Sequence, residues 1–215
     1  MSFVRIAVLV FSLALVAACS GGQTGGVSSG TPVPTATGST ATSATQTAAT
    51  AASTSLSCTS PAQPIVELTE GPYYKAGAPQ RASLLTAGVS GTPLVLTGYV
   101  VSRSCQPIAN AKLDFWQADG KGTYDNSGYT LRGWQLTDAT GAYRLETVIP
   151  GLYPGRTEHI HVKVTVNGKT YTSQLFFPGV SQNEGDSIYS SQMLVKLNTS
   201  TTPATATFTF VVNIA

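Results

Sequence analysis

The sequence predicts an all-β fold, an antiparallel β-sandwich with long active-site loops and little helix. From residue 58 onward the chain is rich in Val, Leu, Thr, Tyr and Phe, and several of these residue types are enriched in strands. Turn residues recur at short intervals between the apolar runs. No long stretch shows the 3.6-residue periodicity of an amphipathic helix. Several short strands with this spacing are typical of a sandwich.

Eight segments carry the strand prediction, because each combines β-favouring residues with turn signals at its ends. They are residues 93–101, 111–118, 132–138, 142–149, 159–166, 169–177, 192–197 and 205–214. Asn167-Gly168, between the fifth and sixth segments, predicts a tight hairpin. Long Gly-rich loops should follow the second and fourth segments.

Residues 1–19 predict an export signal, with Arg5 in a short n-region, an apolar run and then small residues. The apolar run is short for a membrane-spanning helix. The final VAAC resembles a bacterial lipobox, which implies that Cys19 becomes the lipidated first residue; the alternative is an ordinary signal peptide with a chance cysteine. We therefore expect an exported protein, lipid-anchored to the bacterial cell envelope or secreted, that meets a membrane only through the anchor.

Residues 20–57 are mainly Ser, Thr, Ala and Gly, with no charged and no aromatic residue. Such a segment buries too little apolar surface to offset its ordering entropy, so we expect a disordered tether. One folded domain should then span residues 58–215. The net charge is +2 and the chain has no basic run, which argues against a nucleic-acid partner.

Cys58 and Cys105 remain within the predicted domain. An exported protein meets an oxidising compartment, so an even pair predicts a disulfide that fastens the start of the domain to its core. Two unpaired thiols are the alternative. Metal binding by these cysteines is disfavoured, because neither has a His or Cys partner nearby in sequence.

His159 and His161 are the only histidines in the chain and lie in one predicted strand. Side chains alternate along a strand, so both histidines and Lys163 share one face, with the two histidines about 7 Å apart along the strand. Two imidazoles on one face can bind one ion. The spacing alone leaves zinc, copper and iron open, and a satisfied polar contact is the alternative for either histidine.

Four segments together resemble the intradiol ring-cleavage dioxygenases, a family that includes protocatechuate 3,4-dioxygenases and catechol 1,2-dioxygenases. In order along the chain, they are LTEGPYY (68–74), DFWQADGKGTY (114–124), a long stretch from RGWQ to HIHVKV (132–164) and SQLFFPG (173–179). The resemblance implies a mononuclear, non-haem Fe(III) site. Its ligands by motif position are Tyr124, Tyr153, His159 and His161. Phenolate suits this ion, because a nearby trivalent cation lowers the pKa of tyrosine.

The resemblance also implies roles for residues around the metal. Arg156 should stabilise charge on the substrate, and Gln174 should orient Arg156. Tyr153 should leave the metal when substrate binds and accept a proton. Pro72 and Tyr73 match a pocket wall that touches the ring, although a simple turn with a packed aromatic is the alternative for both.

The implied activity is the cleavage of catecholic rings between the two hydroxyls with O2, which gives cis,cis-muconate-type products. The partners are then a small aromatic diol and O2. A non-catalytic, surface-tethered β-sandwich binding module is the alternative, and a zinc or copper enzyme that uses the two histidines is another. The chain departs from the family pattern at Glu158, which we expect to be exposed. It also has a tether where catechol 1,2-dioxygenases have a helical dimerisation segment, so we do not expect their dimer.

Overall fold

The computed structural model describes residues 56–60 and 62–214. The predicted export signal, its lipidation site Cys19 and the tether up to residue 55 lie outside the described residues. Within the described ranges, no helix is long and apolar enough to cross a membrane.

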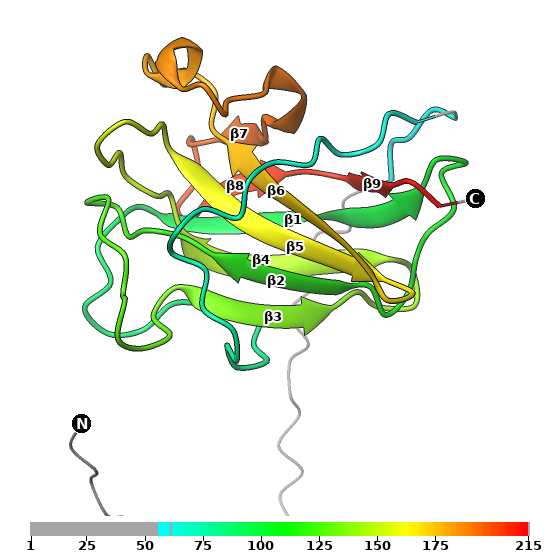
Figure 1. Ribbon diagram of the computed structural model, residues 1–215, viewed down its shortest axis with the longest axis horizontal. Coiled ribbons are helices and arrows are strands. Elements are labelled where there is room, and N and C mark those ends of the chain that lie inside the picture. Colours follow the sequence, from blue (N-terminus) through cyan, green and yellow to red (C-terminus); the bar gives the residue numbers. More distant parts are fainter. Residues whose placement is uncertain (1–55, 61, 215) are drawn as a thin grey trace, which may run out of the picture. The chain divides into compact units, whose positions relative to one another are not determined.

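Two β-sheets form the domain, which confirms the predicted sandwich (Figure 1). One sheet has the order β4-β1-β8-β7, with β9 also pairing with β1; the other has the order β3-β2-β5-β6. The strands are β1 (Pro93–Ser102), β2 (Lys112–Trp116), β3 (Arg132–Leu136), β4 (Ala142–Val148), β5 (His159–Val166), β6 (Lys169–Phe176), β7 (Lys196–Asn198), β8 (Ala204–Thr207) and β9 (Phe210–Val212). Two 3₁₀ turns, η1 (Asn183–Gly185) and η2 (Ser191–Met193), complete the described elements.

The first sheet departs from the prediction in three respects. Pairing is not antiparallel throughout, because β8 and β9 both run parallel to β1. The predicted strand 192–197 begins instead in η2, and only its end belongs to β7. The predicted strand 205–214 is two strands, separated at Phe208-Thr209.

The separation of β8 from β9 has a local cause at Gly98. The Phe208 carbonyl lies so close to Gly98 that a Cβ there would overlap its oxygen. That oxygen accepts a hydrogen bond from the Tyr143 hydroxyl at 2.9 Å, and Phe208 N–H donates to Thr97 O at 3.0 Å. The chain therefore bends at Phe208 and pairs with β1 again from Val100 onward.

The core lies between the sheets and explains the orientation of β5. Ile160, Val162 and Val164 are fully buried in it, as alternation along the predicted strand requires. The opposite face of β5 therefore carries His159, His161 and Lys163. The register places Trp116 of β2 and Gln174 of β6 on either side of His161, so one row of side chains crosses this outer face.

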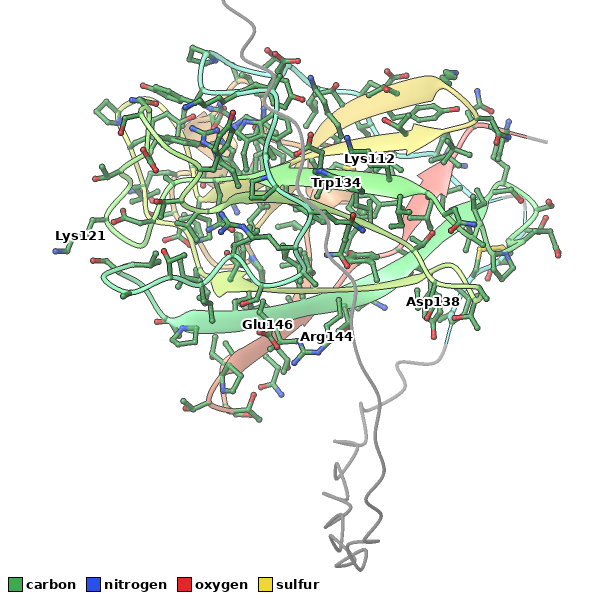
Figure 2. All side chains as sticks on the ribbon, turned by 90° about the horizontal axis from the view of Figure 1, so that it is seen from below. Lys112, Lys121, Trp134, Asp138, Arg144 and Glu146 are labelled. Atoms are coloured by element: carbon green, nitrogen blue, oxygen red, sulfur yellow. A yellow bond between two sulfur atoms is a disulfide. The ribbon has the colours of Figure 1, made fainter. Side chains whose placement is uncertain are left out.

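Strand β4 illustrates the solvated side of the first sheet. Arg144 and Glu146 form an ion pair of 3.0 Å there (Figure 2), and both side chains are at least 40% exposed. A surface ion pair of this kind adds little stability. Arg144 is consequently a useful control position for substitutions at the buried arginines described below.

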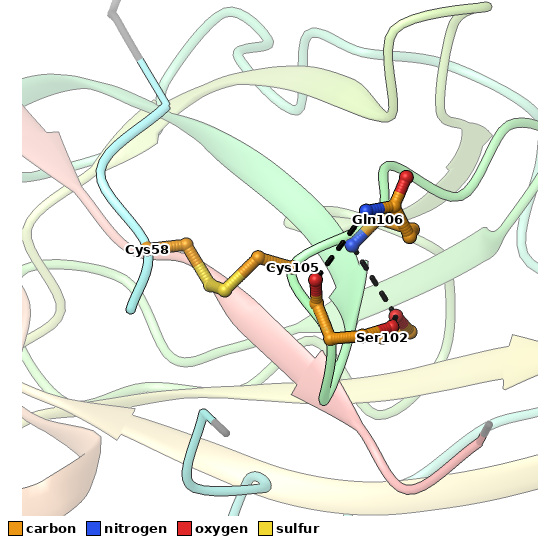
Figure 3. Close-up of a disulfide and its surroundings, with 5 residues drawn as sticks. Cys58, Ser102, Cys105 and Gln106 are labelled. Carbon is orange, nitrogen blue, oxygen red and sulfur yellow. Dashed lines mark hydrogen bonds between the residues drawn. A yellow bond between two sulfur atoms is a disulfide. The ribbon is translucent and has the colours of Figure 1, made fainter. Parts of the chain in front are cut away.

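Cys58 and Cys105 are joined by a disulfide at the predicted pair, with their Cα atoms 5.8 Å apart (Figure 3). Cys105 lies in the turn after β1, where its N–H donates to Ser102 O at 3.0 Å. The cysteines pack beside a small cluster that includes Val101 and Val211. The start of the described domain is thus attached to the end of β1 and to β9.

Candidate active site

The two histidines of β5 lie side by side in the interior, with 2% and 1% of their surfaces exposed. Their Nε2 atoms are 3.0 Å apart. His159 Nδ1 is 2.6 Å from Thr157 O, and a carbonyl oxygen only accepts, so Nδ1 carries the proton. His159 Nε2 is then the acceptor nitrogen, and its lone pair faces His161 Nε2 and the Tyr153 hydroxyl.

Both imidazoles are neutral at physiological pH. Burial lowers the pKa of His159 to about 4. Burial, and then the neighbouring His159, hold the pKa of His161 well below its usual value. His161 is further fixed by Trp116, whose ring stacks on it with centroids 4.7 Å apart and an interplanar angle of 8°. Two neutral, oriented imidazoles are the form that metals bind.

Tyr153 and Tyr124 reach the histidines from two different loops. The Tyr153 hydroxyl lies 3.3 Å from His159 Nε2. The ring of Tyr124 lies 5.6 Å from that of Tyr153 and 6.5 Å from that of His161, measured between centroids. The structure therefore brings together all four residues that the sequence predicts as metal ligands.

The hydroxyl of Tyr124 is buried and has no hydrogen-bond partner among the described residues. Burial, followed by the neighbouring Tyr153, raises the pKa of Tyr124 far above its usual value of 10.0. Burial also raises the pKa of Tyr153. Without a cation both tyrosines are neutral phenols, and one of them leaves a polar atom unsatisfied.

Arg132 positions the loop of Tyr124, a role that the sequence reading missed. It is 2% exposed. Its Nη2 donates to Asp125 O at 2.9 Å, and its Nη1 donates to Tyr73 O at 2.6 Å. Gly122, at a φ of +78°, lies where a Cβ would overlap the Leu152 carbonyl oxygen, which brings the Tyr124 and Tyr153 loops into contact. The buried guanidinium of Arg132 therefore joins the backbone segments of Tyr73 and Asp125, and Gly122 allows the Leu152 segment to approach them.

Arg156 lies beside Tyr153 and is held from two directions. Its Nε donates to Asp186 Oδ2 at 2.8 Å and its Nη2 to Gln174 Oε1 at 2.5 Å. Its Nη1 points to the Tyr153 hydroxyl at 3.4 Å. Gln174 Nε2 in turn donates to Thr69 O at 2.9 Å. The contact of Gln174 with Arg156 agrees with the orienting role expected for it, and Asp186 is a further partner that no motif indicated.

The predicted pocket wall is only partly present at the site. The ring of Tyr73 stacks on Tyr124 with centroids 4.4 Å apart and an angle of 18°, and its edge meets Tyr153. Tyr73 is thus part of the aromatic cluster. Pro72 is exposed, and its contact with a substrate ring stays a prediction.

The segment that carries Tyr73 is fastened to the outer face of the second sheet. Glu70 forms an ion pair of 2.5 Å with Lys163 of β5. The Tyr74 hydroxyl donates to Asp114 Oδ2 at 3.2 Å, and Lys163 Nζ lies 3.3 Å from the centre of the Tyr74 ring. These contacts hold the segment against β2 and β5 and so keep Tyr73 over Tyr124.

The prediction that Glu158 is exposed is wrong: the residue is half-buried. Strand β5 begins only at His159, so strand alternation does not fix the direction of the Glu158 side chain. Burial raises the pKa of Glu158.

A cleft of about 470 Å³ opens beside Tyr153 and Arg156. It is lined by Leu152, Tyr153, Pro154, Gly155, Arg156 and Thr157 on one side and by Gln182, Gly185 and Asp186 on the other. Its size suits a small aromatic ligand. The described residues hold no cluster of three or more His, Cys, Asp or Glu side chains that could bind a metal, so a metal here depends on the tyrosines.

Comparison with known proteins gives a consistent result. Residues 69–213 match the family model described as dioxygenase. Catechol 1,2-dioxygenase of Acinetobacter baylyi is 27% identical over 153 residues, which cover 57% of this chain and 49% of that protein. The chain spans about half the length of the curated relatives it matches.

Two solved structures extend the likeness. The dioxygenase domain of a dioxygenase carbohydrate-binding protein fusion from Streptomyces sp. SirexAA-E is 44% identical, with a TM-score of 0.69 over 71% of this chain and 100% of that one. An intradiol ring-cleavage dioxygenase from Tetranychus urticae is 25% identical, with a TM-score of 0.63 over 68% and 92% of the two chains.

Proposed function

Because the chain belongs to the family of intradiol ring-cleavage dioxygenases, we propose that it is a non-haem Fe(III) enzyme that opens catecholic rings between their two hydroxyls. O2 is the second substrate, and both of its atoms enter a cis,cis-muconate-type product. The observation that carries the proposal is the clustering of two phenol and two imidazole side chains beside a cleft of suitable size.

The residues present fit a ferric ion. The Tyr124 hydroxyl is a buried polar atom with no hydrogen-bond partner in the part of the chain that the structure describes, and a bound cation would satisfy it. The unprotonated His159 Nε2 faces His161 Nε2 at 3.0 Å and the Tyr153 hydroxyl at 3.3 Å, so its lone pair is directed at two of the other predicted ligands. Two phenolates would balance two of the three charges of Fe(III), and such charge balance matters in a site that excludes water. Tyr124, Tyr153, His159 and His161 would therefore hold the ion.

The bound ion supplies a Lewis acid that binds the diol and draws electron density from it. The chain's own residues would transfer a proton, stabilise charge on the substrate and hold the ion. Tyr153 lines the cleft, so its phenolate oxygen would take a proton from a substrate hydroxyl, which is general-base chemistry. Arg156 Nη1 points to the same oxygen at 3.4 Å, and its guanidinium would stabilise negative charge that develops on the substrate. Tyr124, His159 and His161 would remain ligands throughout.

The alternative functions fit the site less well. A binding module gives no reason for two facing, buried imidazoles beside a buried phenol that has no partner among the described residues. A zinc or copper site would use the same histidines, but the other donors within reach are phenols, and phenolate is a hard donor that favours Fe(III).

Oxygen consumption tests the function directly. With the iron-loaded full chain we expect catechol to consume one O2 per ring opened, and ¹⁸O2 to place two labelled atoms in a ring-opened diacid detected by mass spectrometry. Resorcinol, whose hydroxyls are not adjacent, is the control and should consume none. Catechol oxidation to a quinone without label, or no oxygen uptake, would contradict the proposal.

We further propose that the protein is exported and lipid-anchored through Cys19. The apolar first 19 residues support this, and so does the Cys58–Cys105 disulfide, since such bonds persist in oxidising compartments. Fractionation of cells should recover the wild type in the membrane fraction and a Cys19→Ser variant in the fraction without membranes. Equal recovery of both proteins in the membrane fraction would refute the lipid anchor.

A further inference from the structure

The cleft beside the proposed iron site is charge-balanced. Among the described residues that line it, the charged side chains are Arg156 on one wall and Asp186 on the other. These two form an ion pair of 2.8 Å, with side-chain exposures of 13% and 2%. A ligand that enters the cleft therefore meets one cation and one anion that already compensate each other.

Asp186 is fixed by more than the ion pair. Its Oδ2 also accepts the Thr157 N–H at 2.9 Å, and its Oδ1 accepts the Ile188 N–H at 2.9 Å. Burial alone would raise the pKa of this carboxyl, but these hydrogen bonds and Arg156 outweigh burial and lower it. The carboxylate is ionised and cannot move away from Arg156 without losing several bonds at once.

Arg156 is in turn held in one orientation. Asp186 occupies Nε and Gln174 occupies Nη2, so Nη1 is the nitrogen left to point towards Tyr153 and the cleft. A planar guanidinium held along two edges presents its remaining N–H groups in a fixed direction. Its Nη1 is available to stabilise charge that develops on a reacting group, but a full ion pair with a second anion would require the guanidinium to leave Asp186.

This arrangement bears on which catechol the cleft accepts. A ring carboxylate that leaves water needs a cation of its own, because a desolvated, uncompensated charge is costly. Arg156 is already paired, and no other cation is among the described residues of the cleft. An uncharged catechol has no such requirement.

We infer that Asp186 is a specificity-determining and positioning residue: it neutralises Arg156, so that the cleft prefers uncharged catechols to ring-carboxylated ones, and it aims the guanidinium at Tyr153. This inference rests on the proposed function for its substrate class. It concerns a residue in the 182–186 turn, where the sequence shows no motif.

The test compares catechol with protocatechuate, which carries a ring carboxylate, in the wild type and in Asp186→Asn. The wild type should favour catechol. In the variant, turnover of catechol should fall at least tenfold, because Arg156 loses its orientation. The ratio of kcat/KM for protocatechuate over catechol should rise at least tenfold, because Arg156 becomes free to pair with the carboxylate. Asp138→Asn, at an exposed turn on the surface (Figure 2), is the matched control and should leave both numbers unchanged.

Equilibrium binding separates this inference from the proposed function. Calorimetry of the iron-loaded protein without O2 gives the Kd of catechol and the Kd of protocatechuate with no turnover. In Asp186→Asn the affinity for protocatechuate relative to catechol should rise, as the ratio of kcat/KM does. A protein that shows this shift but opens no ring would refute the proposed reaction and leave the charge selectivity standing.

A gain of function provides a second variant that does not disturb the buried pair. Gln182 is exposed on the cleft wall, so Gln182→Lys adds an unpaired cation and should raise the relative affinity for protocatechuate at least fivefold. A wild type that prefers protocatechuate, or an Asp186→Asn variant that weakens both catechols by the same factor, would overturn the inference.

Discussion

Replacing Tyr124 with Phe is expected to lower the affinity for iron by at least about 100-fold without destabilising the metal-free protein. Loss of a residue that hydrogen-bonds to a metal ligand typically costs about 10-fold to 100-fold in metal affinity, and loss of a ligand itself should exceed that. In the metal-free protein the buried Tyr124 hydroxyl has no partner within residues 56–60 and 62–214, and such a group costs about 1–3 kcal/mol. Its removal should therefore leave the free energy of unfolding unchanged or raise it.

Tyr143 offers the matched control, since it is also a buried tyrosine but lies in the core. Its hydroxyl donates to Phe208 O at 2.9 Å, so Tyr143→Phe should lose about 1 kcal/mol of stability and keep its iron. Urea unfolding of the metal-free proteins and iron competition with a chelator measure both quantities. If Tyr124→Phe lost stability as Tyr143→Phe does, or kept full iron affinity, Tyr124 would be a packed aromatic and not a ligand.

Replacing Arg156 with Ala should leave iron bound and lower turnover by about 100-fold to 1,000-fold, the usual effect of removing one preorganised donor that stabilises developing charge. The guanidinium contacts Tyr153 only through Nη1 at 3.4 Å, so the metal ligands do not depend on it directly. Single-turnover rates and iron content on the same sample give the two readouts.

Two further variants make the Arg156 result interpretable. Arg156→Ala leaves the buried Asp186 carboxylate without its cation, which costs stability; Arg156→Lys keeps the charge but loses the planar fork, and should be intermediate in rate. Arg144→Ala removes an exposed arginine from a surface ion pair and should match the wild type. Full turnover in Arg156→Ala would make Arg156 a structural arginine.

Local pattern predicted one part of the candidate site, and the resemblance to a known family predicted the rest. Alternation along residues 159–166 put His159 and His161 on one face, and β5 has the bounds expected for it. The resemblance added Tyr124, Tyr153, Arg156 and Gln174, which the structure brings together.

Other features depend on tertiary packing, which leaves no local signal. In the sequence, nothing distinguishes Arg132 from other strand residues. Its role follows from the hydrogen bonds that its guanidinium donates to Tyr73 O and Asp125 O. Asp186 lies in a loop of small polar residues. Its role depends on its ion pair with Arg156, which is thirty positions away in the sequence. The break between β8 and β9 follows from the contact of Phe208 with Gly98 on a distant strand.

Metal analysis combined with the visible spectrum tests the central claim most directly, in the wild type and in Tyr153→Phe. We expect about one iron per chain and a reddish protein, because ferric tyrosinate absorbs visible light, and we expect the band to change in Tyr153→Phe. A colourless wild type that takes up no stoichiometric iron, or a Tyr153→Phe variant with unchanged iron content and spectrum, would contradict the assignment of Tyr124, Tyr153, His159 and His161 as a ferric site.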